Sequence, residues 1–410
     1  MRVALLTREY PPDVYGGAGV HVEQLSLQLA ELVEVSVHRW ASPAGDRRAA
    51  AGAPTGSISV CDHRAWEALE GDAPELAALR AVSIDLTMAA AVADADVVHS
   101  HTWYAQFGGH LAKLVHGVPH VATVHSLEPR RPWKAEQLGG GYALSRFCER
   151  TALEGADAVI AVSEASLNDI LEAYPAIDPA VVHVVHNGID TERWAPDHGT
   201  EALERNGIDP RRPSVLFVGR ITRQKGVDLL LRAAESLAPD AQLILCAGEP
   251  DTEQLSLQVR RAVERLKESR DGVVWIQRML GRAELVQLLT HATVFACPSI
   301  YEPMGIVNLE AMACETAVVA SDTGGIPEVV LDGETGLLVA LEPGSEDMGP
   351  ADPDAFAAEL AAALNELLRD PDRAAEMGRA GRRRAVERFG WPQAARRTVE
   401  IYERVLGERD

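Results

Sequence analysis

Two basic residues, Arg220 and Lys225, lie in the segment VGRITRQKG, between a short apolar run and a helical pattern. Two cations at the end of a strand can converge on one phosphate group, and charge-assisted hydrogen bonds are about twice as strong as neutral ones. A solvated basic loop is the alternative. The formal charge of −22 favours the phosphate interpretation, because an acidic chain needs local cations to hold an anion. We therefore predict that Arg220 and Lys225 bind a departing phosphate.

A second candidate segment, residues 301–310, reads YEPMGIVNLE. Proline suits the first position of a helix and glycine permits close approach of the backbone, so we expect a helix to begin at about Pro303. The backbone N–H groups of Gly305, Ile306 and Val307 would then point outward from the positive end of the helix dipole. Such a helix start is a favourable place for a diphosphate.

The same segment contains two carboxylates, Glu302 and Glu310, eight residues apart. On a helix they would lie roughly 12 Å apart along the axis. The paired carboxylates of a retaining glycoside hydrolase are only about 5 Å apart. The spacing instead suits two hydroxyl contacts along one extended ligand, with solvated helix carboxylates as the alternative. The neighbouring helix start favours the ligand interpretation.

Histidines are frequent in one part of the first half, at His99, His101, His110, His116, His120 and His125. Their spacing matches no known set of metal ligands, and we predict neither a metal nor a cofactor. His125 ends the apolar run VATVH, so we expect it to face a ligand at the carboxyl end of a strand. His101 and Trp103, in HSHTWYAQ, follow the preceding run and could frame a sugar. Ordinary loop residues are the alternative.

Three cations, Arg130, Arg131 and Lys134, follow in the loop HSLEPRRPWK. They could bind the phosphate of an acceptor, and a solvated loop without a ligand is an equally open interpretation. Gly16 and Gly17 lie in LLTREYPPDVYGGAGVHVEQL, which has the same order of strand, glycine loop and helix as VLFVGRITRQKGVDLLL. Both arrangements leave backbone N–H groups free at a helix start, where anions bind.

Short apolar runs alternate with helical patterns along the chain, which is typical of parallel α/β sheets. The runs span 3–7, 35–38, 97–99, 121–124 and 158–162, and then 215–218, 243–247, 273–276, 294–296, 317–320 and 337–339. We predict two Rossmann-like, doubly wound domains that face a cleft, with ligands at the carboxyl ends of the strands. The expected division is a first domain over 1–190, a linker over 191–212, a second domain over 213–390 and a helix at 391–410 that crosses back onto the first. Residues 41–58 are expected to form a surface loop.

Composition excludes several classes of protein. With 39 basic and 61 acidic residues, the chain is unsuited to binding nucleic acid or a membrane surface. The five cysteines are widely separated and contain no C-x-x-C pair, which indicates thiols in a reducing compartment. The sequence shows neither a signal-peptide core nor a long apolar segment, so we expect a cytoplasmic protein. The G-x-S-x-G, Walker and G-x-G-x-x-G motifs are absent from the sequence, which argues against hydrolases, kinases and dehydrogenases.

Taken together, YGGAG, His125, HNGID, Arg220 with Lys225, EPMGIVNLE and SDTGGIPEVV resemble the retaining glycosyltransferases of GT-B fold over nearly the whole chain. The opening MRVALLTREYPPDVYGGAGVHV and the loop HSLEPRRPWK are similar to actinobacterial glycogen synthases, also described as α-maltose-1-phosphate synthases. The resemblance implies transfer of glucose from ADP-glucose to glucose 1-phosphate, to an α-1,4-glucan end, or to both. A UDP-glucose or GDP-mannose donor, another acceptor, and a nucleotide-sugar-binding regulator without catalysis are the alternatives, and a homo-oligomer stays open.

The resemblance also implies roles for individual residues. Arg220, Lys225 and the amides of Gly305, Ile306 and Val307 would contact the donor diphosphate, Glu310 the ribose and Glu302 the hydroxyls of the transferred glucose. His125 would contact that glucose near the reacting carbon, and the Gly16-Gly17 turn would lie beside the donor phosphates and the acceptor. The resemblance further implies that the nucleoside diphosphate departs and the acceptor attacks from the same face, so no side chain need act as a nucleophile. The leaving phosphate would help to take the proton of the acceptor. The expected work of the site is electrostatic, stabilising charge that grows on the phosphate.

Overall fold

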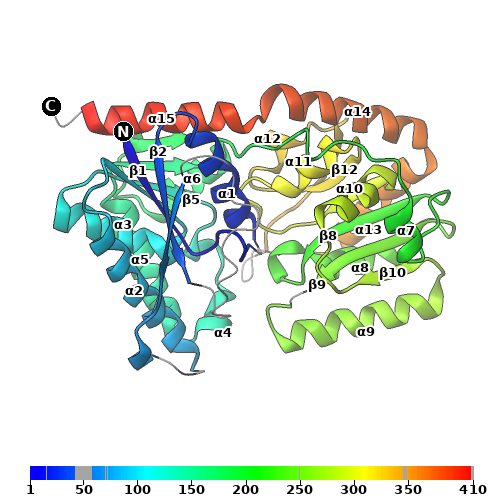
Figure 1. Cartoon of the computed structure of the whole chain (residues 1–410). Helices are drawn as coiled ribbons and strands as arrows, with labels where there is room; N and C mark the ends of the chain where they lie inside the picture. Colours follow the sequence, from blue (N-terminus) through cyan, green and yellow to red (C-terminus); the bar gives the residue numbers. More distant parts are fainter. Residues whose placement is uncertain are drawn as a thin grey trace. The chain divides into compact units, whose positions relative to one another are not determined.

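The computed structural model describes residues 1–14, 16–41, 58–69, 71, 73–248, 250–344 and 349–407. The chain forms two compact units, one made of Met1–Gly188 with Trp391–Asp410 and the other of Ile189–Gly390. Each unit contains a sheet flanked by helices (Figure 1). The loop expected at 41–58 lies almost entirely outside the described residues, as does Tyr15 of the YGGAG motif.

The first unit is built on a seven-stranded parallel sheet with the order β3-β2-β1-β4-β5-β6-β7. Its strands are β1 (Arg2–Thr7), β2 (Glu34–Trp40), β3 (Ser59–His63), β4 (Val97–His101), β5 (His120–Val124), β6 (Ala158–Ala161) and β7 (Val182–Val184). Strands β3 and β7, the two edge strands, are not among the runs expected from the sequence. Four of the five residues of β3 are exposed, and β7 is only three residues long, so neither strand produces an apolar run.

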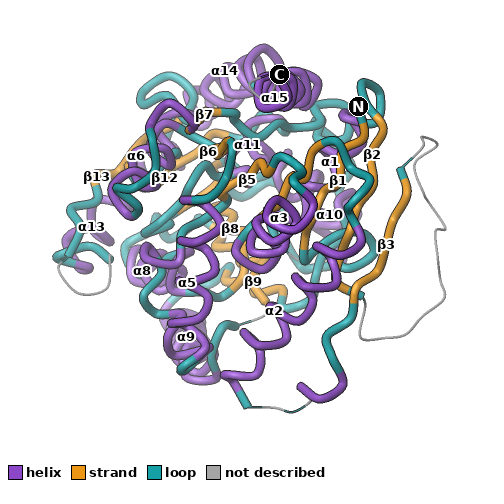
Figure 2. Tube along the Cα trace, turned by 90° about the vertical axis from the view of Figure 1, so that its left-hand side faces the viewer, coloured by secondary structure: helices purple, strands orange, loops and turns teal. Residues whose placement is uncertain are grey.

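Helices cover both faces of this sheet (Figures 1 and 2). Alternate residues of β1 point to opposite faces, as the period of a strand requires: Val3 and Leu5 pack in one apolar cluster, and Ala4 and Leu6 in another. The helices are α1 (Gly17–Leu29), α2 (Pro74–Ala91), α3 (Trp103–His116), α4 (Lys134–Leu138), α5 (Gly141–Glu154), α6 (Glu164–Ala173) and α15 (Trp391–Gly407), with short 3-10 turns η1 (Glu67–Leu69), η2 (Glu128–Arg130) and η3 (Pro179–Val181).

The last helix, α15, belongs to the core of the first unit. Its buried side chains, including Trp391 and Tyr402, lie in the same apolar cluster as Val22 and Leu25 of α1. The Tyr402 hydroxyl is 2.6 Å from Nδ1 of His99 on the central strand β4. The end of the chain therefore contributes both packing and a buried hydrogen bond to a unit whose other residues all lie before position 189.

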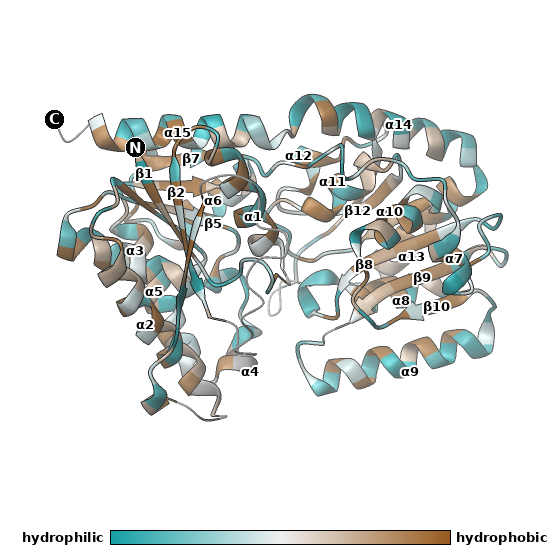
Figure 3. Cartoon of the chain, in the orientation of Figure 1, coloured by the Kyte–Doolittle hydropathy of each residue, from teal (hydrophilic) through white to brown (hydrophobic). Residues whose placement is uncertain are grey.

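The second unit has a six-stranded parallel sheet with the order β10-β9-β8-β11-β12-β13. Its strands match all the expected runs: β8 (Ser214–Arg220), β9 (Gln242–Gly248), β10 (Val273–Ile276), β11 (Val294–Cys297), β12 (Ala317–Asp322) and β13 (Gly336–Ala340). Strands β8 and β9 are coloured largely as hydrophobic in Figure 3, because helices cover both faces of a parallel sheet. The helices are α7 (Glu201–Arg205), α8 (Val227–Ala234), α9 (Glu253–Ser269), α10 (Arg282–His291), α11 (Ile306–Ala313), α12 (Ile326–Val329), α13 (Pro353–Arg369) and α14 (Pro371–Arg388), with the 3-10 turn η4 (Arg223–Lys225).

The segment expected as a linker, 191–212, lies in the second unit. Its short helix α7 buries Ala202 and Leu203, and the Ala202 N–H donates a hydrogen bond of 2.9 Å to the side chain of Gln287 on α10. The polar composition of the segment hid this packing, because its buried apolar side chains, Ala202, Leu203 and Ile208, do not form a continuous apolar run.

Both sheets reverse their strand order once, between β1 and β4 in the first unit and between β8 and β11 in the second. In open α/β sheets, ligands bind beyond the carboxyl ends of the strands at such a switch point. Arg8 and His101 lie at the first switch point, and Arg220 and Pro298 at the second. The topology thus singles out one candidate site in each unit.

Candidate active site

In the second unit, Lys225 and Glu302 meet at the switch point although they are 77 residues apart in sequence. The Nζ atom of Lys225 lies 2.6 Å from Oε2 of Glu302, which also accepts a hydrogen bond of 3.3 Å from the Ser299 hydroxyl. Burial, the largest single influence, lowers the pKa of Lys225, but the charge of Glu302, its hydrogen bond to Lys225 and the neighbouring Cys297 together raise the pKa overall. Lys225 is therefore a fixed cation at this position.

Two glycines let the backbone segments of this site approach each other. Gly226 has φ of +60°, and a Cβ there would lie 1.9 Å from the carbonyl oxygen of Pro298. Gly324 has φ of +53°, and a Cβ there would lie 2.1 Å from the carbonyl oxygen of Glu302. The next residue, Gly325, donates its N–H to that same oxygen at 2.9 Å. The SDTGGIPEVV segment therefore supports Glu302 through the backbone.

The helix expected to begin at Pro303 begins instead at Ile306. Gly305 caps it with φ of +87°, in the left-handed region, and a residue in that conformation cannot continue a right-handed helix. Glu302 therefore precedes the helix, and the axial spacing expected between Glu302 and Glu310 is wrong. Ile306 and Val307 occupy the first turn, where N–H groups have no partner within the helix and attract anions.

Glu310 lies on α11 and is half-buried. Burial raises the pKa of Glu310 to about 8, although the charge of Lys225 opposes the shift. A carboxyl group in this condition is largely protonated at pH 7 and can donate a hydrogen bond to a hydroxyl oxygen.

Arg220, the last residue of β8, keeps 45% of its side chain exposed. Its Nη1 atom lies 3.5 Å from Oδ1 of Asp251. The guanidinium is thus at the carboxyl end of the sheet, within reach of solvent, while Lys225 is held more deeply by Glu302. The two cations that were paired from the sequence thus lie at the end of β8 (Arg220) and in the η4 turn before α8 (Lys225).

In the first unit, three imidazoles gather at the carboxyl ends of β4 and β5. His101 Nδ1 is 3.2 Å from His125 Nε2, and His21 Nδ1 is 2.7 Å from Oδ1 of Asn187. The ring centroids of His21 and His125 are 4.5 Å apart. Burial and the neighbouring imidazoles lower the pKa of His101 and His125 well below the usual value, and burial lowers the pKa of His21 to about 4. All three rings are therefore neutral at pH 7.

His101 and His125 were expected at a ligand site from the sequence, whereas His21 and Asn187 were not. His21 lies in the amphipathic pattern of α1, and Asn187 belongs to the HNGID motif, where nothing local indicates a partner 166 residues away. Ligand atoms of His21, His101 and His125 all lie within 4.8 Å of one another, so these residues could hold a metal ion. The expectation of chemistry without a metal remains a prediction.

Two family models match the chain: "Glycosyltransferase Family 4" over residues 15–193 and "Glycosyl transferases group 1" over residues 200–384. An α-maltose-1-phosphate synthase of Mycolicibacterium smegmatis is 54% identical over 408 residues, covering 99% of this chain and all of that protein. The chain belongs to the family of GT-B glycosyltransferases that contains these synthases. The resemblance read from the sequence is thereby confirmed, and the protein is a glycosyltransferase.

An α-maltose-1-phosphate synthase of Mycobacterium tuberculosis is 51% identical with the same coverage. Among solved structures, a sucrose-phosphate synthase from Thermosynechococcus elongatus superposes with a TM-score of 0.80 at 24% identity, covering 99% of both chains. That likeness confirms the GT-B fold class of two Rossmann-like domains. Across the described parts of the chain, every helix is too short or too polar to cross a bilayer.

The glycine turn of this glycosyltransferase is organised by Glu9. The N–H of Gly16 donates to Oε2 of Glu9 at 2.9 Å, and Gly17 begins α1. A Cβ at Gly19 would lie 2.8 Å from the Glu9 side chain. The first residues after β1 therefore hold the turn that sequence analysis assigned to the donor phosphates.

The structure contradicts one of the expected acceptor contacts and shows the partners of the others. Trp103 is 1% exposed and packs with Ala78 and Ala81, so its ring has no face left for a sugar. Arg130 is paired with Asp169 at 2.8 Å and Glu172 at 2.6 Å, both on α6. Arg131 is likewise paired with a carboxylate, Glu128, at 2.5 Å, and Lys134, at the start of α4, donates to the Tyr104 hydroxyl at 3.4 Å.

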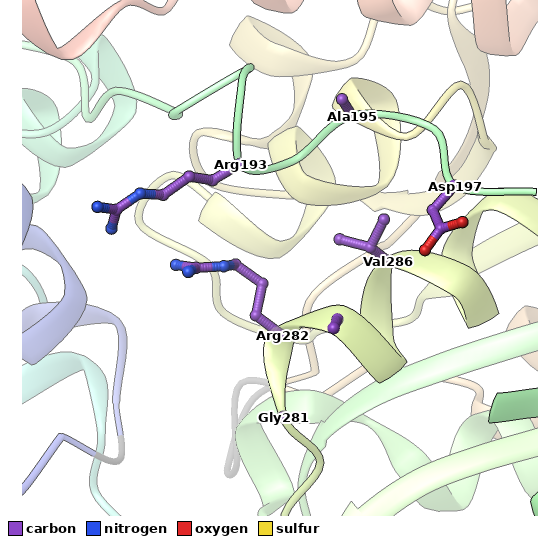
Figure 4. Close-up of a pocket in the computed structure, with 7 residues that line it drawn as sticks. Arg193, Ala195, Asp197, Gly281, Arg282 and Val286 are labelled. Atoms are coloured by element: carbon purple, nitrogen blue, oxygen red, sulfur yellow. The ribbon is translucent and has the colours of Figure 1, made fainter. Parts of the chain in front are cut away.

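The second unit also has an open hollow of about 550 Å³ beside the start of α10. Arg193, Arg282 and Asp197 are among the residues that line it. Figure 4 shows the side chains of Arg193 and Arg282 extending in the same direction from different segments, on the side away from Asp197. None of the site residues expected from the sequence lines this hollow.

We predict that Gly324→Ala disrupts the support of Glu302. The new methyl group would meet a carbonyl oxygen and adopt an unfavourable φ, so the free energy of unfolding should fall by about 3 kcal/mol or more, together with a loss of turnover. Gly333→Ala is the matched control: Gly333 has φ of +74° with no neighbour within 4 Å of its Cβ position, so it should cost only about 1 kcal/mol. Equal losses in urea titrations of the two variants would contradict this reading.

Proposed function

We propose that this enzyme transfers glucose, with retention of the α configuration, from ADP-glucose to glucose 1-phosphate and so forms α-maltose 1-phosphate. The single observation that carries the proposal is the Lys225–Glu302 pair at the switch point of the second unit, 2.6 Å apart. The cation of this pair suits the phosphate groups of a nucleotide sugar, and the carboxylate suits the hydroxyl groups of its sugar. The names of the relatives that match over the full length support the choice of glucosyl donor and phosphorylated acceptor.

In the proposed reaction, the bond between C1 of glucose and the diphosphate oxygen breaks, and ADP leaves. Arg220, Lys225 and the first-turn amides of α11 stabilise the charge that grows on the leaving oxygen, which is the largest contribution available to such a site. The 4-hydroxyl of the acceptor forms the new bond to C1 on the same face and gives its proton to the departing phosphate. Proton and charge therefore balance without a covalent enzyme intermediate.

The remaining residues orient the sugar. Glu302 accepts hydrogen bonds from glucose hydroxyls, and the protonated carboxyl of Glu310 contacts the ribose. In the first unit, the neutral imidazole of His125 contributes a hydrogen bond to the glucose without placing a positive charge beside the oxocarbenium-like carbon. His101 and His21 keep that ring in position.

The test supplies ADP-glucose or UDP-glucose together with glucose 1-phosphate or glycogen, and identifies products by NMR. We expect α-maltose 1-phosphate from ADP-glucose and glucose 1-phosphate, at the same rate with and without EDTA. Elongated glycogen as the sole product would overturn the small acceptor, and transfer from UDP-glucose alone would overturn the donor. Donor binding without transfer to any acceptor would indicate a regulator.

A further inference from the structure

Three histidines from separate segments meet at the carboxyl ends of β4 and β5, which are neighbours in the first sheet. His21 lies on α1, His101 is the last residue of β4, and His125 directly follows β5. One ligand atom of each ring lies within 4.8 Å of the other two. We call these residues the three-histidine cluster. The proposed reaction uses only His125 in contact with the sugar, so the cluster contains more nitrogen ligands than that role requires.

The ring of His21 is held as a metal-binding imidazole would be. Oδ1 of Asn187 can only accept a hydrogen bond, and it lies 2.7 Å from Nδ1 of His21, so Nδ1 carries the proton and Nε2 keeps its lone pair. Nε2 is buried and has no hydrogen-bond partner within the described part of the chain. Histidines that bind metals generally donate their other N–H to an oxygen in this way, which fixes the tautomer. The bond to Asn187 therefore prepares Nε2 for a cation.

The other two rings already have a suitable spacing. Nδ1 of His101 and Nε2 of His125 are 3.2 Å apart, and two nitrogens bound to one tetrahedral Zn²⁺ at about 2.0–2.1 Å lie about 3.3 Å apart. Without a metal, one of these nitrogens donates a hydrogen bond to the other. Nε2 of His101 is also buried without a partner among the described residues. His101 is fully buried, whereas His125 is half-buried, so an ion can reach the cluster past His125.

A fourth histidine close by shows what a purely structural imidazole looks like in this unit. The ring centroid of His99 is 4.3 Å from that of His101. Its Nδ1 is 2.6 Å from the Tyr402 hydroxyl, and its Nε2 is 2.6 Å from the Thr123 hydroxyl. Because both nitrogens are engaged, His99 has no ligand atom to offer. The cluster therefore supplies three ligands and leaves the fourth tetrahedral position to water, as Zn²⁺ sites with three histidines do.

We propose that His21, His101 and His125 bind one Zn²⁺ ion and that the bound ion inhibits glucosyl transfer. Imidazole nitrogen is a ligand that suits Zn²⁺. An ion on His125 removes that ring from the sugar and adds positive charge beside the carbon that becomes oxocarbenium-like, which opposes the reaction. Only the inhibition rests on the proposed function, since binding of the ion needs the three rings alone. The ion is an inhibitor and not a cofactor, so metal-free enzyme is fully active.

Sequence spacing could not indicate this site. His21 lies far from the histidine-rich part of the first half, and its helix gives no sign that the ring turns toward β4 and β5. The parallel order of the strands and the packing of α1 bring the three segments together.

The test measures Zn²⁺ binding to the full chain, first freed of metal with EDTA and dialysed, by competition with a chromophoric chelator. We expect one ion per chain in wild type. His21→Phe and His101→Phe keep an aromatic ring but remove its nitrogens. Each should weaken binding at least about a hundredfold, because loss of a second-shell partner alone costs about 10- to 100-fold. Co²⁺ in place of Zn²⁺ should give the visible absorption of a tetrahedral site in wild type and not in these variants.

Two control variants remove histidines elsewhere. His38 forms a buried pair with His63 at 2.9 Å, and His198 is exposed in the second unit. His38→Asn and His198→Asn should both bind Zn²⁺ like wild type. Asn187→Leu keeps all three ligands but removes the acceptor for His21, so it should weaken binding about 10- to 100-fold. Circular dichroism establishes that each variant is folded, and Asn187→Leu remains informative if a ligand variant is not.

Turnover is then measured with Zn²⁺ at a concentration that saturates the site but lies far below that of the donor, so chelation by the diphosphate is negligible. We expect most of the activity to be lost and to return on addition of EDTA. Absence of Zn²⁺ binding in wild type, or unchanged affinity in both His21→Phe and His101→Phe, would overturn the site. Unchanged or increased turnover with the ion bound would overturn the inhibition. Failure of the proposed function looks different: the variants would still differ in Zn²⁺ binding, but NMR would show no α-maltose 1-phosphate even without Zn²⁺.

Discussion

Replacement of Lys225 by alanine is expected to lower kcat by about 10² to 10³, by analogy with the loss of one donor from an oxyanion hole. Lys225 is the cation that Glu302 holds at 2.6 Å, and charge grows on the diphosphate only as the glycosidic bond breaks. Arg220→Ala should have an effect of the same size for the same reason. KM for the donor should rise less than kcat falls, because the contacts are strongest in the transition state. Steady-state rates over a range of donor concentrations measure both changes.

A second variant separates chemistry from folding. Lys225→Ala leaves the nearly buried Glu302 without its cation, which costs stability as well as rate. Adding Glu302→Gln to Lys225→Ala removes the uncompensated charge, so the double variant should regain stability while turnover stays low. Arg232→Ala, at an exposed ion pair with Asp354, is the control with the same loss of one cation. Near-normal turnover in Arg220→Ala and Lys225→Ala would end the assignment of the diphosphate site.

The Lys225–Glu302 contact also shows what sequence analysis can and cannot reach. Both residues follow apolar runs, and parallel strands bring their carboxyl ends to one edge of a sheet. The pairing of distant segments was therefore accessible from local patterns. The start of α11 was not, because local sequence does not show that Gly305 takes a left-handed conformation with φ of +87°. Proline alone indicated a helix three residues too early.

Side-chain partners set the other limit. Arg130 and Arg131 are adjacent and chemically identical, yet one pairs with α6 and the other with Glu128. The two side chains have different partners only because the η2 turn directs them to different sides. The edge strand β3 was missed for a related reason: its residues face solvent, so burial leaves no trace in their composition. Patterns of burial are readable from sequence, whereas the identity of polar partners requires the folded backbone.

Acidification from pH 7 to pH 5 is expected to destabilise the first unit by several kcal/mol. Eight histidines whose pKa is lowered by burial lie in that unit: His21, His38, His63, His99, His101, His110, His120 and His125. For His21 and His38 the pKa falls to about 4, and for His120 to about 3. Between those values and the usual 6.5, the unfolded chain binds protons that the folded chain does not.

The sign follows from that difference. Stability falls as pH decreases through 6.5 and stops falling only below the folded pKa, so each of these three imidazoles costs about 2 kcal/mol at pH 5. Urea titrations at pH 7, 6 and 5 measure how the free energy of unfolding changes with pH. Hydrogen exchange shows which residues lose their protection as the pH falls. Protection should be lost first in residues 1–188 and 391–407, and later in residues 189–390.

His38→Asn isolates one imidazole away from the candidate site. His38 Nδ1 is 2.9 Å from Nε2 of His63 on the neighbouring strand, and burial is the main reason for its low pKa, with the charge of His63 second. Asparagine does not titrate, so the slope of unfolding free energy against pH should decrease by up to about 1.4 kcal/mol per pH unit between pH 6 and pH 4. An unchanged slope, or hydrogen exchange that begins in the second unit, would show that buried histidines do not set the pH below which the protein unfolds.

If the slope does change, the same desolvation keeps the His21, His101 and His125 rings neutral. Loss of activity near pH 5 would then follow from unfolding of the first unit rather than from titration of a catalytic base.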